Sequence, residues 1–140
     1  WTERIGPTAA LATLEVMERE ESWKKITETG IKMQKGWLKL AKQNNLNITV
    51  SGIAAMTTYS FNCDNALSYK TLITQEMLKK GFLASTNFYA CTEHTDEHLD
   101  LYFNALSDIY KTISKCESDE VNINSLLEGP ISHSGFKRLN

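Results

Sequence analysis

No stretch of this sequence stays apolar for the roughly 20 residues that a membrane-spanning helix needs, and nothing in it resembles a signal peptide. Neither sign of charge dominates, because 15 lysine and arginine residues stand against 17 aspartate and glutamate residues, for a net charge of −2. Such a chain has no overall field that attracts nucleic acid or an acidic membrane. We therefore expect a cytoplasmic protein that binds neither.

Cysteine is also scarce. Cys63, Cys91 and Cys116 are an odd number at wide spacing, which argues against a disulfide framework. The length of 140 residues and a hydrophobic content of 41% suit one domain with a real core. No methionine precedes Trp1, which favours a piece of a longer chain, although a processed or engineered start would look the same.

Residues 1–15 have the pattern of a polar turn that leads into a helix. Pro7 suits the first helical position, and the alanines behind it would let another backbone approach closely. The unpaired N–H groups of a helix start, with the hydroxyls of Thr2 and Thr8, could form an anion site. The local sequence alone favours the alternative, an ordinary capped surface helix.

The rest of the chain alternates between helical and extended patterns. Apolar residues at intervals of three and four predict a helix over residues 23–42 and another after Thr95. Residues 46–51 and 55–61 have the pattern of paired antiparallel strands, with a turn or bulge at Gly52. Residues 82–90 are a further expected strand. This order predicts an α+β fold in which helices pack on a small, mainly antiparallel sheet.

A helix is also expected over residues 66–80, ended by Gly81 in the position after the C-cap. We expect one face of it to be formed by Leu67, Thr71, Met77 and Leu78. Residues 117–140 have the composition of a short helix followed by an irregular tail.

Four segments together resemble a known family. They are Pro7 followed by the helix Ala-Leu-Ala-Thr-Leu-Glu at 10–15, Lys-Thr-Leu-Ile-Thr-Gln-Glu-Met-Leu-Lys-Lys-Gly at 70–81, Phe-Tyr at 88–89 and His-Thr-Asp-Glu at 94–97. This set resembles the C-terminal small domain of class III pyridoxal-phosphate-dependent aminotransferases, closest to the glutamate-1-semialdehyde aminomutase group. The resemblance implies a small domain of the fold-type I kind over residues 1–116, with an N-terminal connecting helix, and a tail over 117–140.

The resemblance also implies a role for Thr2. In the family, a threonine five residues before the proline reaches the pyridoxal phosphate of the neighbouring subunit, and Thr2 stands at that distance from Pro7. The family usually has Ser-Gly-Asn before the proline, whereas this chain has Arg-Ile-Gly at 4–6. The family's Schiff-base lysine lies upstream, and no lysine here matches its motif. The resemblance therefore implies a dimeric parent enzyme acting on an amino donor and a carbonyl or keto-acid acceptor, with no catalytic residue in this portion, which would be inactive alone.

In the aminomutase group, a glutamate before the final strand lies near the substrate channel, and Thr86 stands at about that place here. The missing carboxylate makes an ordinary transaminase at least as plausible as an aminomutase. Ser85, Thr86 and Asn87 remain candidates for the rim of the substrate channel. The alternative is that they merely end a strand.

The residues also allow a metal site or a non-catalytic module. Cys91, His94 and His98 could suggest a metal, but structural zinc needs four convergent ligands and no fourth is apparent, so no metal site is expected. The alternative to an enzyme is a non-catalytic α+β interaction module that docks a partner through its alanine-rich first helix.

Overall fold

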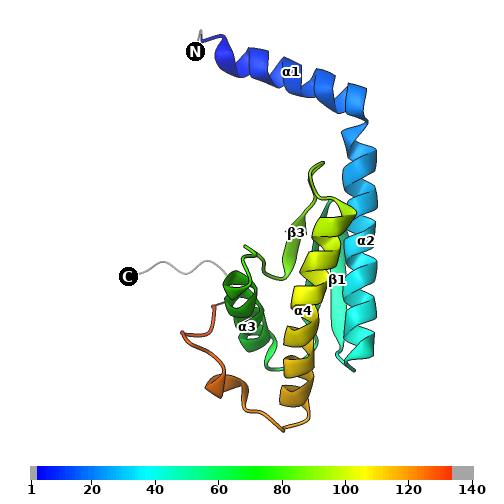
Figure 1. Cartoon of the computed structure of the whole chain (residues 1–140). Coiled ribbons are helices and arrows are strands. Elements are labelled where there is room, and N and C mark those ends of the chain that lie inside the picture. Colours follow the sequence, from blue (N-terminus) through cyan, green and yellow to red (C-terminus); the bar gives the residue numbers. More distant parts are fainter. Residues whose placement is uncertain (1–2, 134–140) are drawn as a thin grey trace.

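The structure is a computed structural model that describes residues 3–133. Its elements are α1 (Ile5–Glu20), α2 (Ser22–Gln43), β1 (Ile48–Ile53), β2 (Met56–Phe61), α3 (Ala66–Lys79), β3 (Asn87–Tyr89), α4 (Asp96–Glu117) and the 3-10 helix η1 (Ile123–Ser125). The three strands form one antiparallel sheet in the order β1-β2-β3. The predicted α+β class, with helices packed on a small antiparallel sheet, is confirmed (Figure 1).

The β1–β2 hairpin alternates as the sequence predicts. On β2, Thr57, Tyr59 and Phe61 are buried, while Met56 and Ser60 are exposed. The turn lies at residues 54–55, two residues beyond the predicted Gly52, because Ile53 pairs with Met56. Gly52 is a strand residue with a φ of 87°, a left-handed conformation that side chains rarely adopt.

Helix α2 packs against the sheet through the predicted stripe. Gly30, Met33, Trp37, Leu40 and Ala41 are buried, although Trp23 near the start of the helix stays exposed. Gly30 lies against the hairpin turn so closely that a Cβ there would come within 1.8 Å of the Ala54 carbonyl oxygen. The approach of helix to hairpin therefore depends on the absence of a side chain at residue 30.

An aromatic cluster fills the space between the sheet and the helices. The ring of Tyr59 lies 4.7 Å from that of Trp37 and 6.3 Å from that of Tyr110, and Phe61 packs against Tyr69 and Tyr110. Rings at these distances and tilted angles gain favourable quadrupole contacts as well as burial. This cluster joins β2 to α2, α3 and α4.

The predicted face of α3 is wrong at most of its positions. Met77 is buried, but Leu67 and Leu78 are exposed and Thr71 is half-buried. The buried residues of the helix are Ser68, Tyr69, Leu72, Ile73 and Met77. This set follows the same three- and four-residue spacing from a different starting point, so the helix is rotated from the predicted orientation.

The end of α3 is as predicted. Gly81 has a φ of 84°, its N–H donates to the Leu78 carbonyl, and the Phe82 N–H donates to the Met77 carbonyl. These two bonds form a Schellman motif, in which glycine supplies the left-handed residue. The strand expected next, over 82–90, is reduced to the three residues of β3, because only Asn87–Tyr89 pairs in register with β2.

Helix α1 extends away from the rest of the molecule (Figure 1) and contains no buried residue. Leu11 and Leu14 are 63% and 60% exposed. Pro7 is the third residue of the helix and not the first, but it still lies in the first turn, where a missing N–H costs little. Glu21, with a φ of 47°, separates α1 from α2.

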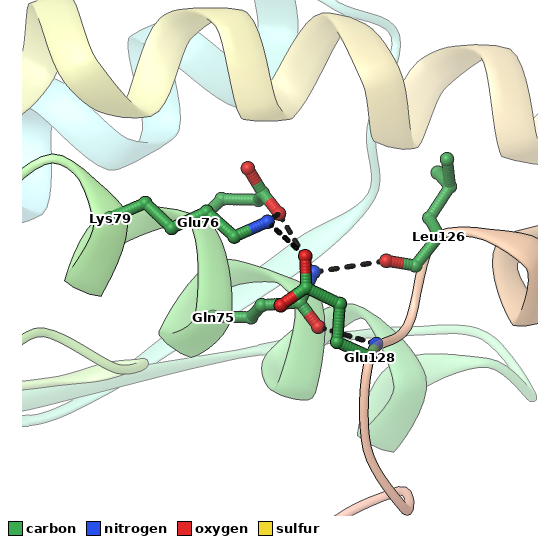
Figure 2. Close-up of polar contacts among 5 residues, drawn as sticks. All are labelled: Gln75, Glu76, Lys79, Leu126 and Glu128. Atoms are coloured by element: carbon green, nitrogen blue, oxygen red, sulfur yellow. Dashed lines mark hydrogen bonds and ion pairs between the residues drawn. The ribbon is translucent and has the colours of Figure 1, made fainter.

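The segment after α4 returns to the body of the molecule. Ile123 of η1 is buried in the core, and Leu126 and Leu127 are half-buried against it. Figure 2 shows Leu126 and Glu128 of this segment in polar contact with α3. The proposed division between residues 116 and 117 stays a prediction.

Within residues 3–133, no helix has both the length and the apolar character that crossing a membrane demands.

Candidate functional site

A cleft of about 540 Å³ lies where the loop before β3, β3 itself, the start of α4 and α2 meet. Met33, Phe82, Leu99 and Tyr102 line it with mostly apolar surface. Polar groups come from the turn between β3 and α4, where Cys91, Glu93 and His94 line the cleft, and from His98 in the first turn of α4. An apolar cleft with a few convergent polar groups is the usual form of a small-molecule site.

His94 is held as a neutral imidazole. Its Nδ1 accepts the Cys91 backbone N–H at 3.0 Å, and its ring packs on Phe88 with centroids 4.8 Å apart. Partial burial, and then the neighbouring His98, lower the pKa of His94 below its usual value of 6.5. The cleft therefore presents an uncharged ring near neutral pH.

His98 closes the first turn of α4. Its Nδ1 accepts the Thr95 N–H at 3.3 Å, while the Thr95 hydroxyl accepts the His98 N–H at 3.3 Å. This reciprocal pair is a capping box in which histidine takes the place usually held by glutamate or glutamine. The side chain of His98 is therefore committed to the helix start.

The inner wall of the cleft is fixed by a bond between two aromatic residues. The Trp37 indole N–H donates to the Tyr102 hydroxyl at 2.9 Å. Burial raises the pKa of Tyr102 well above its usual range, so the hydroxyl stays protonated. This hydrogen bond links Tyr102 of α4 to Trp37 of α2.

The cleft does not fit pyridoxal phosphate. The phosphate group of this cofactor is an anion that proteins hold with arginine, lysine or free backbone N–H groups. Among the described residues, no lysine or arginine lines the cleft, and its charged lining residue is Glu93, a carboxylate. We therefore assign no cofactor contact to these residues.

The start of α1, for which the sequence left open an anion site or an ordinary capped helix, is bonded to a carboxylate of the chain itself. The Glu3 carboxylate accepts the Gly6 N–H at 3.0 Å. Thr8 follows inside the helix, where its own N–H donates to the Arg4 carbonyl at 3.0 Å. Thr2 lies outside the described residues, and its role in cofactor binding stays a prediction.

The three predicted rim residues have different surroundings. Asn87 lines the cleft, and its side-chain oxygen accepts the Thr58 hydroxyl at 2.8 Å. Thr86 is buried, and its carbonyl accepts the Tyr59 N–H at 3.0 Å. Ser85 is half-buried, and neither it nor Thr86 lines the cleft. The rim role remains a prediction for all three, and Asn87 is the best placed.

The histidines and cysteine that raised the question of a metal lie close in sequence but serve the turn before α4. Across residues 3–133, no three His, Cys, Asp or Glu side chains converge as metal ligands. The sequence did not identify the apolar walls of the cleft, because Met33 and Tyr102 lie in different helices and share no local motif.

Two curated proteins are distantly similar to this chain in sequence. The chain is 30% identical over 119 residues to a glutamate-1-semialdehyde 2,1-aminomutase of Clostridium botulinum (strain Alaska E43 / Type E3), covering 72% of this chain and 27% of the relative. It is 28% identical over 113 residues to a 2'-deamino-2'-hydroxyneamine transaminase of Streptomyces kanamyceticus, covering 76% and 28%. No protein-family model matches the chain.

A solved structure shares the fold. The FumI protein of Sphingopyxis sp. MTA144, in its PLP internal aldimine form, superposes with a TM-score of 0.68 at 16% identity, covering 85% of this chain and 29% of that protein. The chain thus spans little more than a quarter of the length of the curated relatives that it matches. In sequence it is distantly similar to the C-terminal region of class III aminotransferases, and its fold is that of the corresponding part of a pyridoxal-phosphate enzyme.

Proposed function

We propose that this chain forms the C-terminal portion of a pyridoxal-phosphate-dependent aminotransferase or aminomutase. The observation that carries the proposal is the similarity to an aminomutase over 119 residues, supported by a shared fold over 85% of the chain. The amino donor and the carbonyl or keto-acid acceptor belong to the whole enzyme, which we infer to be a cytoplasmic homodimer.

The role that we assign to this portion is to shape the site and not to carry the chemistry. Pyridoxal phosphate supplies an electron sink when it is bound to a lysine. No lysine lines the cleft within the described residues, which supports a cofactor lysine elsewhere in the parent protein. The apolar cleft and Asn87 at its edge would then form a wall of the substrate channel.

The test uses both the parent protein, expressed with the sequence that precedes Trp1 in its gene, and the chain alone. Each is mixed with pyridoxal phosphate, reduced with borohydride and mapped by peptide mass spectrometry. We expect one stoichiometrically labelled lysine ahead of Trp1 in the parent and no specific label in the chain alone. Stoichiometric labelling within residues 1–140, or an upstream sequence without a labelled lysine, would overturn the proposal.

A second candidate function rests on α1. This helix has no buried residue and exposes Leu11, Leu14 and Val16, an apolar surface that is typical of a docking helix. A non-catalytic interaction module would use it to bind a partner. Failure to label any lysine in the parent, together with strong hydrogen-exchange protection of α1 on association, would favour this function over the enzyme.

A further inference from the structure

The segment that follows α4 is fixed to α3 in two different ways along its length. Up to Leu127 it is held by apolar packing, with Ile123 buried and Leu126 and Leu127 half-buried. From Glu128 to Ile131 the side chains are exposed, so the remaining attachment is polar. We call residues 126–133 the strap.

The central contact of the strap is made by Gln75 of α3, as Figure 2 shows. Its side-chain oxygen accepts the Glu128 N–H at 2.8 Å, and its NH₂ group donates to the Leu126 carbonyl at 2.9 Å. The second amide hydrogen goes to the Glu76 carboxylate at 2.7 Å. One side chain thus satisfies two main-chain groups of the strap, much as a neighbouring strand would.

Two further residues of α3 hold the strap on either side of Gln75. The Lys79 ammonium lies 2.6 Å from both the Glu76 and the Glu128 carboxylates, on an exposed surface. The Thr71 hydroxyl accepts the Ser132 N–H at 3.0 Å. Exposed ion pairs and single hydrogen bonds of this kind each contribute little, so the polar half of the strap is weakly held.

Leu126 of the strap also forms part of a groove. This groove, of about 350 Å³ between α3 and α4, is lined by the apolar residues Leu72, Ile109 and Leu126. Leu72 and Ile109 are 2% and 4% exposed while the strap is in place. Withdrawal of Leu126 would uncover an apolar surface beside Lys80 and Asp108.

We propose that the strap is a conformational device that opens and closes on α3 while the aromatic core stays folded, and that opening uncovers the α3–α4 groove. Local opening of this kind occurs where a segment has few buried apolar contacts and many exposed hydrogen bonds. The proposal is independent of the function proposed above.

Native-state hydrogen exchange measured by NMR on the whole chain tests it. The reporters are the Glu128 and Ser132 amides, both bonded to α3 side chains, against core amides such as those of Ile73 and Tyr110. Gln75→Ala removes both the acceptor of the Glu128 N–H and the donor to the Leu126 carbonyl, so faster exchange at Glu128 only confirms the loss of its bond. The informative amide is Ser132, whose acceptor on Thr71 is intact, and we expect it to exchange at least about fivefold faster, the factor for one net hydrogen bond, with core amides unchanged.

The methyl signals of Leu72 and Ile109 should shift in the same variant if the groove is uncovered. Lys24→Ala is the matched control, because it removes an exposed ion pair with Glu21 and touches neither a strap residue nor a residue that lines the groove. Thr71→Val is a second variant: the side chain at residue 71 keeps its shape but no longer accepts the Ser132 N–H. The proposal is overturned if strap and core amides change together, if the strap amides are unprotected in the unaltered chain, or if the groove methyls do not respond.

Discussion

Replacing Gly30 by alanine should destabilise the protein even though alanine is the better helix former. A Cβ at this position would lie 1.8 Å from the Ala54 carbonyl oxygen and 2.3 Å from its carbon. Both contacts are backbone, so no side chain can rotate away and α2 must separate from the hairpin. We take the strain as about 3 kcal/mol, the upper end for overpacking. Alanine gains about 1 kcal/mol in helix propensity, so the free energy of unfolding should fall by about 2 kcal/mol.

Urea unfolding followed by tryptophan fluorescence measures this loss, and we expect the midpoint to fall by about 1 M at the m-value of a domain of this size. Gly129→Ala is the control, because nothing lies within 4 Å of a Cβ there. Gly36→Ala should cost less than Gly30→Ala, since its Cβ meets the far end of the Phe103 ring, which can turn aside. Equal midpoints for Gly30→Ala and Gly129→Ala would refute the reasoning.

Two other predictions follow from the contacts of His94 and Thr95, and a third, on Thr2, follows from the family resemblance and the proposed parent enzyme. Because the pKa of His94 is lowered in the folded state, the unfolded chain binds more protons as the pH falls below about 6.5, so stability should decline there. Unfolding curves of His94→Gln should show a weaker decline, and those of the exposed control His133→Gln should not differ from the unaltered chain. Thr95→Ala removes the cap of α4 and should cost about 1 kcal/mol in urea unfolding, whereas an unchanged midpoint would mean that the capping box adds nothing. In the parent enzyme, Thr2→Ala should weaken cofactor retention by about 1.5–3 kcal/mol in equilibrium dialysis, and unchanged retention would leave Thr2 without a role in binding the cofactor.

The elements with a strong periodic pattern were predictable from the sequence. Helix α2 has apolar residues, among them Met33 and Trp37, spaced as on one face of a helix. Helix α4 begins after Thr95 with a capping pattern. Both patterns are local in the sequence, and tertiary packing only reinforces them. Helix α3 was harder, because it has apolar residues on more than one side. Only contact with α4 and β2 decides that Tyr69 and Ile73 are buried while Leu67 and Leu78 are not.

The candidate site was less predictable than the fold. Of the three residues that the family resemblance suggested for a channel rim, Asn87 lines the cleft, and the rim role stays a prediction. The walls of the cleft come from α2, α4 and the loop before β3, which no local motif connects. The contact of Gln75 with the strap joins residues 53 positions apart and leaves no periodic trace. Nine residues had a strand pattern at 82–90, yet only those with a partner on β2 became a strand.

The β1–β2 hairpin has a consequence for the protein before it is folded. No charged residue and no proline occurs between Lys42 and Asp64, and β1 forms an edge of the sheet. Natural edge strands usually carry a lysine, a proline or an inward-pointing charge that discourages pairing with another chain. Without them, a partly folded molecule presents a strand that a second molecule can extend, and the yield of refolding should fall with protein concentration while the folded state keeps its stability.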